Sequence, residues 1–186
     1  LKYATMIFAA FVVVVLVALI LFILINGIPN LKWDFLFGES NYQHPSLVPA
    51  FISTAYVILI TLAIALPLGI CAAIYLVEYA KPGSKVVKVL RTFIDTLAGV
   101  PSIVFGLFGT LLFVPMTGNY SVLAGALTMV LVVLPTIIRS TEEALIAVPM
   151  SLREASYGLG ASKLRTIFKI VLPSAFPGIA TAAVLA

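Results

Sequence analysis

The sequence predicts an all-α integral membrane protein, and three observations support this fold class. Only 10% of the 186 residues are charged and 62% are hydrophobic, whereas soluble domains have about 25% charged residues. The mean hydropathy is +1.21, which indicates an integral membrane protein. Apolar segments alternate with short polar ones, and we expect membrane spans at about 4–25, 51–77, 93–115, 122–138 and 176–186.

The first expected span, 4–25, is long enough as a helix to cross a bilayer core of about 30 Å. It is too long for the hydrophobic part of a signal peptide. The loop 27–50 follows, and its Trp33 is expected to anchor the chain at the membrane interface. One histidine, His44, and one cysteine, Cys71, support neither a metal site nor a disulfide framework.

The second expected span, 51–77, contains Pro67, which is expected to bend the helix. The polar stretch after this span is basic. Lys85, Lys88 and Arg91 recur every three residues, so they share one face of a helix. This pattern predicts a short helix that lies on anionic lipid headgroups.

The third expected span is rich in small residues. The four residues Gly99, Ser102, Gly106 and Gly109 fall on one face of an ideal helix. Small residues on one face let a second helix approach closely. Pro101 lies in the same stretch, so a constriction of a translocation path is the alternative to helix packing.

Charged residues at the ends of the third and fourth spans are expected to pair locally. Asp95 follows Arg91 by four residues, which places the two side chains on the same helical face. Arg139, Glu142 and Glu143 are interpreted as a solvated extension of the fourth span with ion pairs of its own.

A polar segment after Pro149 predicts a short helix over about 152–158. Ser151 and Glu154 have the spacing of a capping box, in which each side chain accepts a hydrogen bond from a backbone N–H of the first turn. Gly158 and Gly160 are expected to end the helix in the left-handed conformation. A helix this short is not stable alone, so other parts of the protein must hold it.

The segment after these glycines predicts a second surface helix. Its apolar stripe consists of Leu164, Ile167, Phe168, Val171 and Leu172, and lies opposite Lys163, Arg165, Thr166 and Lys169. A fifth span, 176–186, is expected to be incomplete.

The positions of the cations predict the orientation in the membrane. With the N-terminus in the cytoplasm, all of the 11 Lys and Arg residues except Lys32 fall on the cytoplasmic side. This agrees with the excess of Lys and Arg that cytoplasmic loops carry. The segment 139–173 is therefore expected to be cytoplasmic, and the net charge of +4 is not interpreted as a nucleic-acid signal.

The segment 154–173 resembles the EAA loop of ABC-importer permeases. The chain has Glu154-Ala155, then Ser156 in place of the usual second alanine, then Gly160 and the Ile170-x-Leu172-Pro173 ending. In that family the short helix sits in a cleft of a cytoplasmic ATPase. The resemblance implies that the residues that couple the chain to the ATPase are Glu154, Ala155, Ser156, Gly160, Ile170, Leu172 and Pro173.

Three further segments resemble phosphate (Pst) importer permeases, and the PstA-type subunit more than the PstC-type. They are 97–109, 139–145 and 148–155. The resemblance implies a type I (MetI-like) importer permease, a single domain over 1–186 with five of six spans, truncated at its C-terminus. It also implies a PstC-like second permease subunit, a PstB-like ATPase that binds the ATP and Mg²⁺, and a periplasmic phosphate-binding protein.

The expected function is therefore ATP-driven import of inorganic phosphate across the inner membrane, with ATP hydrolysis in the partner and no catalytic residue, metal or cofactor in this chain. Alternatives are a permease for another oxyanion or small solute, or a non-transport membrane scaffold. A membrane-embedded enzyme is disfavoured, because it would need ionisable residues clustered at membrane depth, and the sequence shows no such cluster.

Overall fold

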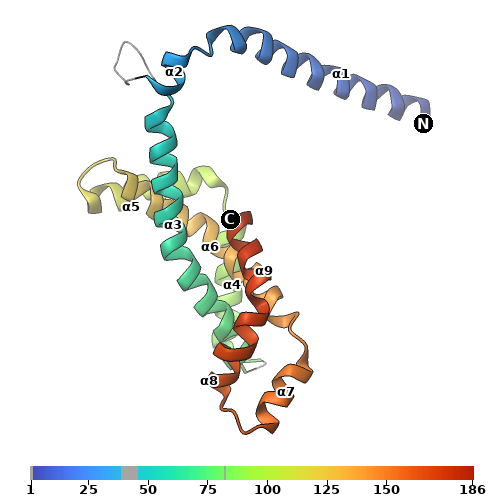
Figure 1. The fold of residues 1–186 in the computed structure, drawn as a ribbon, viewed down its shortest axis with the longest axis vertical. Helices are drawn as coiled ribbons and strands as arrows, with labels where there is room; N and C mark the ends of the chain where they lie inside the picture. The colour runs from blue at the N-terminus through green and yellow to red at the C-terminus, as the bar shows by residue number, and fades with distance from the viewer. Residues whose placement is uncertain (1, 39–45, 82) are drawn as a thin grey trace. The chain divides into compact units, whose positions relative to one another are not determined.

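The computed structural model describes residues 2–38, 46–81 and 83–186, and all of their regular structure is helical (Figure 1). Two compact units divide the chain, Leu1–Thr54 and Ala55–Ala186. They are described separately below. His44 lies outside the described residues.

The first unit is a long apolar helix followed by short turns. Helix α1, Lys2–Gly27, covers the expected span 4–25, and a 3₁₀ turn, η1, follows at Ile28–Asn30. Helix α2, Trp33–Phe37, has a single turn and brings the Trp33 and Phe37 rings to 4.8 Å between centroids. Trp33 is 78% exposed, which fits a residue at a membrane interface.

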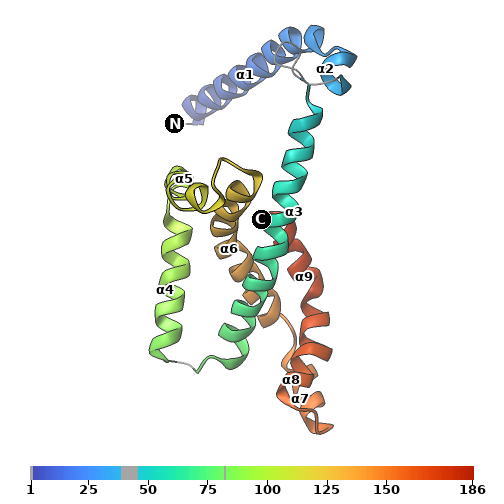
Figure 2. The same cartoon turned by 90° about the vertical axis from the view of Figure 1, so that its left-hand side faces the viewer.

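The second unit is a helical bundle around α6. Figure 1 and Figure 2 show α3, α6 and α9 running alongside one another, with α7 and α8 at one end. Its elements are α3 (Val48–Ile74, which begins in the first unit), the π-helical turn η2 (Tyr75–Tyr79), α4 (Lys85–Gly99), α5 (Ser102–Thr117), α6 (Val122–Ile146), α7 (Met150–Gly158), α8 (Lys163–Thr166), the π-helical turn η3 (Ile167–Val171) and α9 (Leu172–Leu185).

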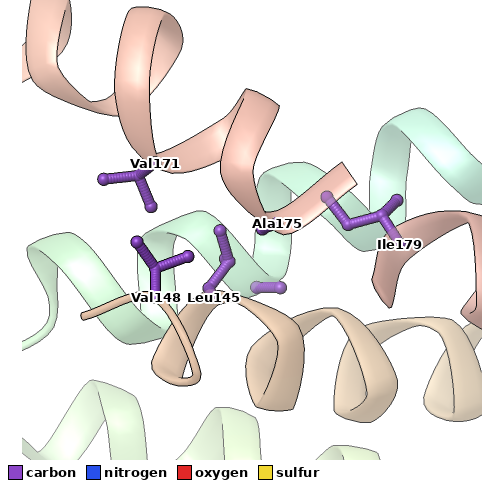
Figure 3. Close-up of a cluster of buried hydrophobic side chains, with 6 residues drawn as sticks. Leu145, Val148, Val171, Ala175 and Ile179 are labelled. Carbon is purple, nitrogen blue, oxygen red and sulfur yellow. The ribbon is translucent and has the colours of Figure 1, made fainter. Parts of the chain in front are cut away.

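Small residues let the helices of the bundle approach one another. A Cβ on Gly178 of α9 would lie 2.5 Å from the Cβ of Ala144 on α6, and a Cβ on Gly69 of α3 would lie 2.5 Å from the Cγ2 of Ile137. Lipid tails are as apolar as the side chains, so close packing of this kind holds membrane helices together. One buried cluster joins α3, the end of α6, η3 and α9 (Figure 3). It consists of Ala73, Leu145, Val148, Val171, Ala175 and Ile179.

The third expected span is broken into two helices. Helix α4 ends at Gly99, α5 begins at Ser102, and the two are bent by 103°. Pro101 precedes α5 and has no N–H to continue the hydrogen-bond ladder of α4. The basic segment and the first part of the expected span therefore form one helix, α4, and the predicted boundary between a short surface helix and the span is wrong.

The shared face predicted for the four small residues fails for Gly99, because the break places Gly99 on α4 and the other three on α5. Gly99 lies on α4, and both Gly99 and Gly106 have open space where a Cβ would stand. Only Gly109 has the predicted close contact, with Thr128 of α6. Ser102 is exposed at the start of α5.

The predicted surface helix and the fifth span form one continuous helix. Residues Lys163–Leu185 are helical over 23 residues and are long and apolar enough to cross a membrane. Within the predicted stripe only Ile167 and Val171 are fully buried, whereas Leu164 and Phe168 are 59% and 57% exposed. The π-helical turn η3 inserts a residue into the helical repeat, so the regular spacing assumed from the sequence fails here.

Four helices of the described residues are long and apolar enough to cross a membrane, or five if the bent pair α4–α5 counts as one span. They are Thr5–Gly27, Val48–Tyr79, Val122–Ile146 and Lys163–Leu185. Helix α3 continues through Pro67 without interruption. The chain is an integral membrane protein with several spans.

Candidate functional site

Helix α7 begins two residues earlier than predicted. It starts at Met150, directly after Pro149, and no side chain caps its N-terminus. The predicted capping box of Ser151 and Glu154 is therefore wrong, because Ser151 already lies within the first turn. Glu154 is exposed.

The end of α7 requires glycine at one position. Gly160 has φ +79°, and its N–H donates to the Tyr157 carbonyl at 2.9 Å. The Ala161 N–H donates to the Ser156 carbonyl at 3.1 Å, which closes the turn. Gly158 is the last residue of the helix and does not have a positive φ, so the left-handed conformation predicted for both glycines occurs only at Gly160.

The buried face of α7 is held by Arg153. Its guanidinium forms an ion pair with Glu78 of η2, and its Nη2 donates to the Leu145 carbonyl at 2.8 Å. The Arg153 and Glu78 side chains are only 11% and 6% exposed. A buried ion pair is tolerated when further hydrogen bonds satisfy it, and the Leu145 carbonyl satisfies this one.

A pair of hydroxyl groups attaches α7 to α8. Ser156 Oγ and Thr166 Oγ1 lie 2.8 Å apart, and both residues are buried. Thr166 Oγ1 also donates to the Ser162 carbonyl at 3.2 Å. Both side chains face inward, so the opposite face of α7 is left open.

Replacing Ser156 by alanine is expected to cost about 1 kcal/mol of stability. The loss is small because the Thr166 hydroxyl keeps the Ser162 carbonyl as a partner. Thr166→Val should cost more, because the Ser156 hydroxyl would then lose the only partner found for it in the described residues. Thermal unfolding of the full-length protein in detergent measures both losses, and equal losses would contradict this ranking.

The C-terminal end of α7 and the loop after it border a hollow of about 340 Å³. Leu159 beside it is 90% exposed. The hollow is lined by Ser156, Leu159, Gly160, Ala161, Arg165, Lys169 and Ile170. The structure thus gathers three of the predicted coupling residues, Ser156, Gly160 and Ile170, around one hollow.

The other predicted coupling residues lie elsewhere. Glu154 and Ala155 are exposed on α7 and do not line the hollow. Leu172 is half-buried against the cluster shown in Figure 3, and Pro173 is exposed at the start of α9.

Two ion pairs join α4 to α6 and replace the local pairs predicted from the sequence. Arg91 pairs with Glu142 at 3.1 Å, and Arg139 pairs with Asp95. The predicted pairing of Arg91 with Asp95, and that of Arg139 with Glu142 or Glu143, is therefore wrong. The two helices pack against each other, so charges distant in sequence become the nearest opposite charges.

The long apolar helices define a membrane protein with several spans. The short helix α7 is held at one end of its bundle by Arg153 and Ser156. The family described as binding-protein-dependent transport system inner membrane component matches residues 65–186. The match covers most of the chain, and the chain belongs to this family.

Curated relatives extend the similarity beyond the matched region. The chain is 39% identical to the probable ABC transporter permease protein YqgI of Bacillus subtilis, over 96% of the chain and 61% of the relative. It is 42% identical to the phosphate transport system permease protein PstA of Mycobacterium leprae, over 82% and 47%. It is 46% identical to PstA 1 of Mycobacterium tuberculosis, over 66% and 40%. The chain spans about half the length of these relatives.

The fold resembles that of a solved transporter. A structure of the MetNI methionine ABC transporter in inward-facing conformations matches with a TM-score of 0.61. The match covers 75% of this chain and 65% of the other, at 23% sequence identity. This similarity supports the MetI-like helical fold.

Proposed function

We propose that the chain is a membrane-spanning subunit of an ATP-driven importer that carries inorganic phosphate across the inner membrane. The observation that supports the substrate is the identity of 42% and 46% to phosphate transport permeases named PstA. The segment 97–109, which resembles the Pst signature, includes the break between α4 and α5.

We propose that α7 docks on a cytoplasmic ATPase. Its exposed side presents Glu154, Ala155, Tyr157 and Leu159, while Arg153 and Ser156 hold the opposite side to the bundle. A helix of 9 residues is held in place by these contacts and offers its other face to a partner. The remaining residues of the motif, Ile170, Leu172 and Pro173, lie on η3 and α9, and η3 packs against α7.

The proposed assembly contains a PstB-like ATPase that binds ATP and Mg²⁺, a PstC-like second permease subunit and a periplasmic phosphate-binding protein. This chain binds no cofactor in the proposal, and its exposed apolar helices face lipid or the second permease. The N-terminus and the segment 139–173 lie on the cytoplasmic side.

We place the translocation path of the proposal at the break between α4 and α5. A Cβ on Gly99 or Gly106 would stand in open space, and Pro101 and Ser102 are exposed. Gly109 differs, because it packs against α6. Broken helices in transporters line the path that the solute takes, because their free backbone groups need a polar surrounding.

Phosphate uptake tests the proposed function. Vesicles that contain the full-length protein, the second permease subunit, the ATPase and the binding protein should accumulate radioactive phosphate when ATP is supplied to the ATPase side. Vesicles without ATP serve as the control. Uptake of sulfate or molybdate in place of phosphate would support the alternative of another oxyanion.

The proposed orientation predicts which loops are reached from outside the cell. In a protein whose natural cysteines, Cys71 among them, are replaced by alanine, an impermeant thiol reagent should label Leu31→Cys and Asn119→Cys in intact cells, but not Leu159→Cys. All three sites are exposed, so permeabilised cells should show labelling of each and serve as the control. Labelling of Leu159→Cys in intact cells contradicts the orientation.

A further inference from the structure

A buried polar cluster joins α7 to the membrane helices at the end of the bundle. We propose that the Arg153–Glu78 ion pair transmits the movement of α7 to α3 and α6, so that Arg153 and Glu78 are positioning residues for coupling. This inference rests on the proposed docking of α7 on an ATPase.

One guanidinium group contacts two membrane helices at once. Arg153 Nη1 donates to Glu78 Oε1 in the π-helical turn that continues α3, and Nη2 donates to the Leu145 carbonyl in the last turn of α6. The planar guanidinium holds its donors in a fixed geometry, so a displacement of α7 moves both acceptors together. A lysine has one charged nitrogen and lacks this fixed fork.

The same cluster extends to the helix that follows α7. Lys163 Nζ donates to the Glu78 carbonyl and lies 4.8 Å from the centroid of the Tyr79 ring. The Glu78 carboxylate therefore accepts a hydrogen bond from Arg153, and the Glu78 backbone carbonyl accepts one from Lys163. The end of α3 is thus attached to residues on both sides of the loop that joins α7 to α8.

The Arg153–Glu78 pair is more buried than the other ion pairs of the described residues. Its side chains are 11% and 6% exposed, whereas Arg139 and Asp95 are 50% and 64% exposed. Exposed ion pairs contribute little because water screens them. Separating a buried pair is costly because it leaves each charge buried without a partner. The Arg153 and Glu78 side chains should therefore stay together when α7 moves.

The points of attachment lie at irregular turns of the helices. Glu78 is in η2, and Thr166, the partner of Ser156, is directly followed by η3. π-Helical turns occur frequently at functional sites in helices. Glu78 thus lies within such a turn, and Thr166 lies directly before one.

The test uses the whole transporter and separates docking from coupling. Glu78→Gln removes the charge with little change of shape, and Glu143→Gln, an exposed carboxylate on α6, is the matched control. Two quantities are measured for each variant: the ATPase that co-purifies, and the phosphate taken up per ATP hydrolysed. If the wild-type transporter takes up no phosphate, the proposed function is wrong. The coupling inference is then tested with the solute that the wild type does carry, as the amount of that solute taken up per ATP hydrolysed.

Glu78→Gln is expected to keep ATPase co-purification at the wild-type level, because Arg153 still donates to the Leu145 carbonyl and the glutamine oxygen can still accept from Arg153. It should lower the phosphate taken up per ATP by about tenfold, because the charge that fixes the pair is lost. Glu143→Gln should change neither quantity. An unchanged ratio of uptake to hydrolysis in Glu78→Gln overturns the inference, and so does a loss of co-purification, because the pair would then serve only to hold α7 in place.

The reversed pair guards against variants that simply fold poorly. Arg153→Glu combined with Glu78→Arg restores opposite charges at the two positions. Each variant is described by its phosphate uptake per ATP relative to the wild type. The value for the double variant should exceed the product of the values for the two single variants, which indicates a direct interaction between the two side chains. A double variant no better than this product overturns the specific role of the pair.

Discussion

Gly160→Val is expected to lower co-purification of the ATPase with the full-length permease by about tenfold, from a strain of ~1–2 kcal/mol at a left-handed position. Gly160 has φ +79°, which a β-branched residue adopts only with strain. Its N–H closes the turn onto Tyr157. Relief of the strain would move α8 relative to α7 and deform the hollow that both line. No membrane span changes, so insertion and expression should stay normal.

Gly160→Asn separates backbone strain from bulk at the proposed docking surface. Asparagine has a size close to that of valine but adopts the left-handed conformation more readily. It should therefore keep most of the co-purification that valine loses. Equal losses for both variants would show that bulk against the partner, and not the backbone of the turn, is responsible. Normal co-purification and uptake in Gly160→Val would contradict a coupling role for this segment.

Gly178→Leu is expected to destabilise the helical bundle strongly. A Cβ at this position would lie 2.5 Å from the Cβ of Ala144 and 3.4 Å from its Cα, so α9 and α6 must separate. Overpacking of this kind costs about 1–3 kcal/mol, and the better helix propensity of leucine offsets about 1 kcal/mol of it at most. The thermal unfolding midpoint of the full-length permease in detergent should fall by several degrees.

Ala180→Leu is the matched control on the same helix. Ala180 is exposed, and leucine there lies away from α6. Its unfolding midpoint should stay near that of the wild type. If both variants lower the midpoint equally, the contact between Gly178 and Ala144 does not hold α9 in place.

Helix breaks near proline and glycine were only partly predictable. A proline such as Pro101 makes a helix break possible, but the angle of 103° between α4 and α5 depends on how α5 packs against α6. Pro67 shows the opposite outcome, because α3 continues through it. Neighbouring helices can satisfy the backbone groups that a proline frees in a membrane helix, so a proline alone does not determine whether the helix breaks.

The sequence by itself determined the membrane class, most helix positions and the left-handed turn at Gly160. These features are local: each segment must satisfy its own backbone hydrogen bonds in lipid, and only glycine adopts a positive φ without strain. The motif residues of the candidate site were recognised for the same reason, since their spacing lies within one segment.

Only the tertiary structure decided which distant residues meet. Arg153 was assigned no role from the sequence, yet it bridges Glu78 and Leu145, and Gly178 gave no signal beyond its identity. The expected local ion pairs failed because the nearest opposite charge to Asp95 comes from another helix. Charges and close contacts depend on the distance between side chains in space, and that distance follows from helix packing and not from spacing along the chain.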